Sequence, residues 1–75
     1  MERLRRVTAV IEREGDGHVA LCPELDIASQ GNTMEEARYN LQEALALFME
    51  TASPDEIAER FHSAAYITGL DVAFG

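Results

Sequence analysis

The chain has one cysteine, few basic residues and no long uninterrupted run of apolar residues. A single thiol, Cys22, cannot form an internal disulfide, so the sequence excludes a disulfide scaffold and suits a reducing compartment. Phosphate binding relies on clustered Lys and Arg, so we expect no direct binding to nucleic acid. A membrane span needs about 20 apolar residues and no leader is apparent, so we expect a cytoplasmic protein without a membrane segment.

What is present indicates a small acidic globular domain. The 75 residues predict one domain over 1–75, and 47% of them are hydrophobic, which is ordinary for a folded protein. A chain of this size buries only about 60% of the surface that its unfolded form exposes, so self-association to a dimer or tetramer is expected. The 14 acidic and 6 basic side chains give a net charge of −8, which fits a basic protein partner or good solubility.

Alternation of apolar and polar residues predicts three strands in the first part of the chain. The glycines around Asp16 predict a tight hairpin turn, in which Asp16 and Gly17 tolerate positive φ. The predicted strands are Leu4 to Arg13, His18 to Cys22, and Ile27 to Gln30.

A capping box predicts the start of a long helix. The Thr33 hydroxyl can accept from the Glu36 backbone N–H, while the Glu36 carboxylate can reach back to the N–H of Thr33. The helix is expected from Met34 to about Thr51, and helical spacing places its apolar residues on one side. That side consists of Met34, Ala37, Leu41, Ala44, Leu45, Phe48 and Ala52.

A second, shorter helix is expected after Ser53 at the N-cap and Pro54 at the first helical position. A last strand is expected from Tyr66 to Phe74, with Leu70, Val72 and Phe74 on one face. The order β-β-β-α-α-β predicts an α+β domain of two layers, in which a three-stranded antiparallel meander is covered by the main helix and the final strand returns to the sheet.

The side of the main helix opposite its apolar residues carries an acidic stripe with one aromatic residue. One interpretation is a solvated face. The other is a docking face for a basic partner, because tyrosine is a favoured anchor and carboxylates speed the encounter. The stripe consists of Glu36, Tyr39, Glu43, Ala46 and Glu50. Leu47 is expected to pack under the second helix.

One face of the predicted sheet has no helix to cover it, and three apolar strand residues are candidates for that face: Val10, Val19 and Leu21. If helices cover only one face, some of these apolar side chains lie on the other. An open sheet face or a strand edge would then pair between copies of the chain.

Candidate residues for metal chemistry do not form a convincing set. A nuclease of the two-metal type needs converging carboxylates, and only Glu12, Asp16, Glu24 and Asp26 are placed to be considered. A zinc site needs three or four N or S ligands, which one cysteine and two scattered histidines do not supply. We therefore expect no cofactor and no enzymatic activity.

His18 is interpreted as a strand residue with a satisfied hydrogen bond, His62 as a helix-end residue, and Cys22 as a small buried hydrophobe.

Three motifs in this order resemble the HicB-type antitoxins. They are the hairpin with an acidic-glycine turn, the strand that runs into a Pro-acid-Leu segment, and the glycine turn with its capped helix and a following Asn-Leu-x-Glu-Ala. In this chain the last two read Leu21-Cys22-Pro23-Glu24-Leu25, then Gln30-Gly31-Asn32-Thr33-Met34-Glu35-Glu36-Ala37 and Asn40-Leu41-Gln42-Glu43-Ala44. The resemblance covers roughly residues 5 to 50.

The resemblance implies a partial RNase H-like fold without nuclease activity. It also implies an antitoxin that neutralises a HicA-type toxin, a small basic RNA-cleaving protein, by stoichiometric masking. Operator binding by this chain alone is not expected, since no DNA-binding segment follows Phe74. The alternatives are an orphan oligomeric HicB-like domain without a toxin partner and, more remotely, a metal-dependent RNase H-type nuclease. The candidate partner-binding residues are Glu36, Tyr39, Glu43, Glu50, Glu24 and Asp26.

Overall fold

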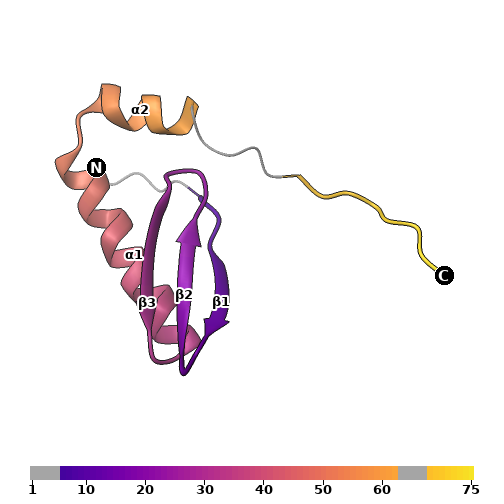
Figure 1. The fold of residues 1–75 in the computed structure, drawn as a ribbon. Helices are drawn as coiled ribbons and strands as arrows, with labels where there is room; N and C mark the ends of the chain where they lie inside the picture. The colour runs from indigo at the N-terminus through magenta and orange to yellow at the C-terminus, as the bar shows by residue number, and fades with distance from the viewer. Residues whose placement is uncertain (1–5, 63–67) are drawn as a thin grey trace.

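The computed structural model describes residues 6–62 and 68–75, and Figure 1 shows three strands followed by two helices. This is the α+β class that the sequence predicts. The elements are β1 (Val10–Glu14), β2 (Gly17–Cys22), β3 (Ile27–Gly31), α1 (Met34–Thr51) and α2 (Pro54–His62).

The strands form one antiparallel sheet in the order β1-β2-β3. Glu14 pairs with Gly17, which leaves a two-residue hairpin loop between β1 and β2. Gly15, the first loop residue, has φ of 61°. The positive φ of this turn lies at Gly15, and not at Asp16 or Gly17, the two residues that were expected to tolerate it. A hairpin loop with positive φ at its first position alone is of the II′ kind, which favours glycine there.

Strand β1 begins at Val10, so the predicted start at Leu4 was too early. Val10 pairs with Leu21, near the end of β2, and Pro23 follows β2. Residues 6–9 belong to no strand, and residues 1–5 lie outside the described part. The Thr8 N–H donates instead to the Glu24 carboxylate at 2.9 Å. A side chain thus satisfies a backbone donor where the ladder has ended.

Helix α1 has the predicted bounds and lies against β3 and β2. A Cβ built on Gly31 would lie 2.5 Å from the Ala37 nitrogen, so only glycine allows the end of β3 to approach the helix this closely. The Asn40 amide donates to the Gln30 carbonyl at 2.8 Å, which ties the helix to the same strand. These contacts fix how far the helix is rotated about its axis.

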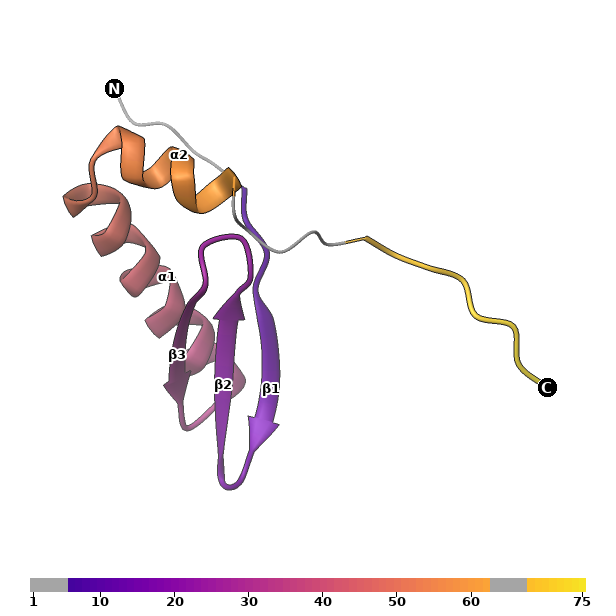
Figure 2. The ribbon, with the colours of Figure 1, turned by 45° about the horizontal axis from the view of Figure 1, so that its top comes forward.

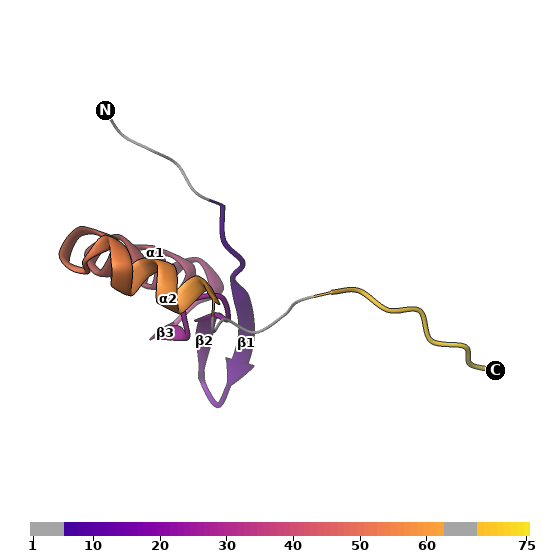
Figure 3. The same ribbon diagram turned by 90° about the horizontal axis from the view of Figure 1, so that it is seen from above.

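The buried core is small and lies between the sheet and α1. Both helices lie on one side of the sheet, as Figures 2 and 3 show from two directions. Met34 is exposed, so the buried side of α1 begins at Ala37. The fully buried residues are Ala20, Cys22, Leu25, Ala37 and Leu41, with Val7, Ile11, Ile27, Leu45, Phe48, Met49 and Phe61 packed around them.

Helix α2 crosses the end of the sheet where the β2–β3 loop lies (Figure 1). The Ser53 hydroxyl accepts from the Glu56 N–H at 3.1 Å, as the N-cap pattern predicts. Arg60 donates to the Leu25 carbonyl at 2.8 Å and lies over the Phe48 ring at 5.1 Å. One guanidinium therefore connects α2, the loop and α1.

The final strand is not formed in residues 68–75, which adopt neither strand nor helix. Tyr66 and Ile67 lie outside the described residues. Leu70, Val72 and Phe74 are 79%, 70% and 97% exposed. The segment runs away from the sheet in all three views (Figures 1 to 3). The segment has the apolar alternation of a strand. A strand also needs a neighbouring strand for its hydrogen bonds, and no described strand pairs with this segment.

Candidate docking face of helix α1

The capping box sets the start and phase of α1. The Glu36 N–H donates to the Thr33 hydroxyl at 3.0 Å, as predicted. The Glu36 carboxylate, however, accepts from the Asn32 N–H at 3.0 Å and not from that of Thr33. Glu36 is exposed at the edge of the acidic stripe, and one of its oxygens is already used to hold the helix start.

Tyr39 and Glu43 form a pair on the exposed side of the helix. The Tyr39 hydroxyl donates to the Glu43 carboxylate at 2.6 Å, one helical turn away. This hydrogen bond, followed by the negative charge of Glu43, raises the pKa of Tyr39. The ring is 58% exposed, so the phenol presents a neutral, oriented aromatic surface beside a carboxylate.

Leu47 belongs to the same face, which corrects the expectation that it packs under α2. Its side chain is 61% exposed, whereas the neighbouring Phe48 ring lies under the Arg60 guanidinium of α2. At about 100° per residue, Leu47 points roughly 20° from Glu36 and 40° from Glu43, at the margin of the acidic stripe, and lies one turn along the helix from Glu43. The structure thus brings together an exposed surface that we call the outer face: Glu36, Tyr39, Glu43, Ala46, Leu47 and Glu50.

Glu24 and Asp26 do not join the outer face. They lie in the β2–β3 loop, at the end of the sheet opposite the start of α1 (Figure 1). Burial opposes ionisation of Glu24, but the hydrogen bonds from Thr8, from its own backbone and from Cys22 outweigh it and lower the pKa of Glu24. This carboxylate therefore has a structural role. Asp26 has φ of 54°, a left-handed conformation that aspartate tolerates better than most residues.

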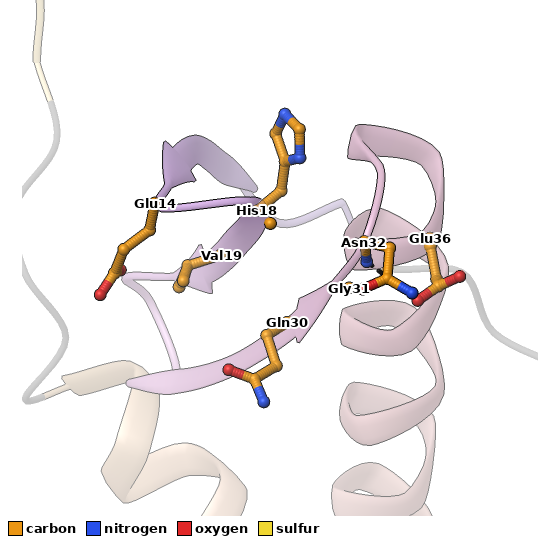
Figure 4. A pocket seen from close by; sticks show the side chains of 8 residues that line it. Glu14, His18, Val19, Gln30, Gly31, Asn32 and Glu36 are labelled. Atoms are coloured by element: carbon orange, nitrogen blue, oxygen red, sulfur yellow. Dashed lines mark hydrogen bonds between the residues drawn. The ribbon is translucent and has the colours of Figure 1, made fainter.

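A polar pocket of about 430 Å³ lies beside the start of α1, between the tip of the β1–β2 hairpin and the end of β3 (Figure 4). The His18 Nδ1 is buried and has no hydrogen-bond partner, so the expectation of a satisfied histidine was wrong. The turn between Gly31 and the helix cap creates this concavity, and no sequence signal marked it. Its lining residues are Glu14, Gly17, His18, Val19, Gln30, Gly31, Asn32 and Glu36.

Cys22 is fully buried, as predicted, and its thiol approaches the Glu24 carboxylate at 3.6 Å. Burial is the main cause that raises the pKa of Cys22, which keeps the thiol protonated and unreactive.

Among residues 6–62 and 68–75, no three His, Cys, Asp or Glu side chains gather as a metal site would require. No helix in those ranges has the length and apolar character for crossing a bilayer.

Comparison with known proteins gives a relative of nearly the same length. A UPF0150 protein of Helicobacter pylori is 35% identical over 69 residues, which cover 91% of this chain and 96% of that protein. No protein-family model matches the chain, and no solved structure matches it. The identity over almost the whole of both chains shows that this chain belongs to the UPF0150 family.

Proposed function

We propose that this chain is a HicB-like antitoxin that binds a HicA-type RNA-cleaving toxin and neutralises it by stoichiometric masking. The resemblance of its ordered motifs to the HicB-type antitoxins supports this function. The observation that carries it is the outer face, where Tyr39 and Leu47 lie exposed among the carboxylates of Glu43 and Glu50. The same proposal includes a partial RNase H-like fold and a cytoplasmic location. It also includes the expectation that the protein catalyses no reaction.

Recognition would rest on charge and on a small apolar centre. A protein that cleaves RNA presents basic side chains to phosphates, and the carboxylates of the outer face would occupy the positions of those phosphates. Tyr39 and Leu47 would supply the buried centre of the interface, since aromatic anchors contribute most of the binding energy in such contacts. The hydrogen bond from Tyr39 to Glu43 orients the ring before binding, which lowers the entropy lost on association.

The test is a titration of the purified toxin from the adjacent reading frame with a charge-reversed variant. Glu36 is unsuitable for it, because its carboxylate also caps α1. The variant is Glu43→Lys/Glu50→Lys. The control is Glu12→Lys/Asp16→Lys, which reverses two exposed carboxylates around the hairpin and changes the net charge equally.

We expect the helix variant to weaken binding about 30- to 100-fold, corresponding to roughly 2–3 kcal/mol, because like charges then meet across the interface. The hairpin control should stay within about threefold of the wild-type dissociation constant. Equal affinities for the wild type and the helix variant would exclude the outer face. A loss of binding confined to the hairpin control would move the docking site to the hairpin.

A second candidate is an orphan domain that assembles with itself and has no toxin partner. It is favoured by Val10 and Leu21, which are 42% and 37% exposed on the sheet face that no described helix covers. Co-expression with the adjacent gene product separates the two functions. Growth rescue with co-purification supports the antitoxin, whereas a homo-oligomer that captures no basic partner supports the orphan domain.

A nuclease of the RNase H type is the third and least supported function. Incubation of the pure protein with an RNA·DNA hybrid and Mg²⁺ or Mn²⁺ should give no cleavage. Metal-dependent cleavage that co-purifies with the protein would revive this function and contradict the antitoxin mechanism.

A further inference from the structure

The segment 68–75 has the pattern of a strand without a partner. Leu70, Val72 and Phe74 alternate with Asp71 and Ala73, and all five are exposed. Period-two alternation is typical of a strand with one face buried. The segment, which we call the tail, diverges from the sheet of its own chain (Figures 1 and 2).

Strand β1 offers an edge for such a strand. Within the described residues it pairs only with β2, so its other side presents unpaired N–H and C=O groups. Ile11 pairs with the buried Ala20, which assigns Ile11 and Arg13 to the helix-covered face. Val10, Glu12 and Glu14 therefore lie on the open face of the sheet.

We propose that the tail pairs with the free edge of β1 in a second copy of the chain, and that two copies exchange tails reciprocally. Each tail then pairs with the β1 edge of the other copy, and the exchange closes in a twofold dimer because both copies make the same contact. The outer side of the tail becomes the new edge of each four-stranded sheet. The inference does not depend on the toxin. It concerns a different surface from the outer face of α1.

The charge of Asp71 indicates which side chains of the tail lie on the open face of the sheet, the face that the helices do not cover. If Leu70, Val72 and Phe74 lie on the open face, they extend the apolar surface of Val10 and Leu21. Asp71 then lies on the face of Arg13. The opposite phase would place Asp71 beside Glu12 and Glu14, and neighbouring like charges on adjacent strands are unfavourable.

A second copy is the occupant that the fold favours. Among the residues whose burial the structure describes, only five side chains are fully buried and two of them are alanines, which is a small core. The tail adds three large apolar side chains that the single chain leaves exposed. Exchange of an identical element between protomers requires no new complementary surface.

The first test is the oligomeric state of the full chain by sedimentation and light scattering over a range of concentrations. We expect a dimer. Leu70→Asp/Phe74→Asp should raise its dissociation constant at least about 100-fold while the circular dichroism of the helices is retained. The control is Met34→Asp/Leu47→Asp, which changes two exposed apolar residues of α1 and should leave the dimer intact. A monomeric wild type, or a dimer that is unaffected by the tail variant, would overturn the proposal.

The charge pairing gives a second test by sedimentation. Arg13→Asp and Asp71→Arg should each weaken the dimer about three- to tenfold, and the double variant should recover most of the loss. Equal additive losses in the double variant would contradict the assigned phase.

A disulfide trap distinguishes exchange from folding back. Glu12→Cys/Val72→Cys places one thiol at the centre of β1 and one at the centre of the tail, on the same predicted face. Cys22 is buried and does not compete. Oxidation should give a covalent dimer on a non-reducing gel. An internal disulfide in a monomer would show that the tail joins its own sheet, and would refute the exchange.

Discussion

Substitution of Gly31 by alanine tests how the sheet sets the position of α1. The added Cβ would lie 2.5 Å from the Ala37 nitrogen and 2.8 Å from the Glu36 carbonyl carbon. Both neighbours are backbone atoms of the first turn, so the helix start must move to relieve the contact. Small-to-large changes of this kind cost about 1–3 kcal/mol, and the close backbone contacts argue for the upper half of that range.

One further term sets the size of the expected effect on stability. Alanine reduces the conformational freedom of the unfolded chain, which returns about 0.4–1 kcal/mol. The net loss is therefore about 2 kcal/mol, a large share of the roughly 4–11 kcal/mol expected for a chain of this length. For a domain of this size, the melting temperature should fall by roughly 8–16 °C.

Thermal unfolding followed by far-ultraviolet circular dichroism provides the measurement. Gly69→Ala is the matched control, because a Cβ at Gly69 would meet nothing within 4 Å. Its unfolding free energy should stay within about 0.5 kcal/mol of the wild type. If Gly31→Ala were as stable as Gly69→Ala, the close approach of β3 to α1 would not hold the helix in place.

Three further predictions follow from single side chains. Arg60→Ala should lower the free energy of unfolding by about 1–2 kcal/mol in urea, because it removes the donor to the Leu25 carbonyl; no change would mean that α2 is held by other contacts. The pKa of Glu24 is lowered in the folded state from its usual 4.5, so its stabilising effect is present above that pH and is lost as the pH falls through the folded value. Glu24→Gln should therefore flatten the acid side of the stability profile, whereas an unchanged profile would contradict the bond from Thr8. Cys22, with its raised pKa and full burial, should react with a thiol reagent far more slowly in native than in unfolded protein, and equal rates would contradict a buried thiol.

Local signals predicted much of the fold. The capping box and apolar spacing gave both ends of α1, since Thr33 and Ala37 interact within one turn. The predicted first strand began too early in the sequence. Its start depends on where its partner β2 ends, and the alternation of its own residues does not show this. The final strand was expected for a related reason: Leu70 and Phe74 carry the pattern of a strand, but periodicity does not show whether a neighbouring strand is there to pair with it.

The candidate site was predicted less completely. Helical phase correctly grouped Tyr39, Glu43 and Glu50, because their positions follow from one element. Leu47 was missed, since its exposure depends on the path of α2 across α1. The hydrogen bond between the Thr8 N–H and the Glu24 carboxylate joins two segments, and no local pattern in the sequence reveals it.

The most direct measurement of the proposed antitoxin function is an RNA-cleavage assay of the adjacent gene product titrated with this protein, with calorimetry of the same mixture. Masking predicts saturable binding at a fixed stoichiometry and cleavage that disappears at the same ratio. It also predicts that Glu43→Lys/Glu50→Lys shifts both curves together. Full cleavage in the presence of excess wild-type protein, with no heat of binding, would contradict the antitoxin function.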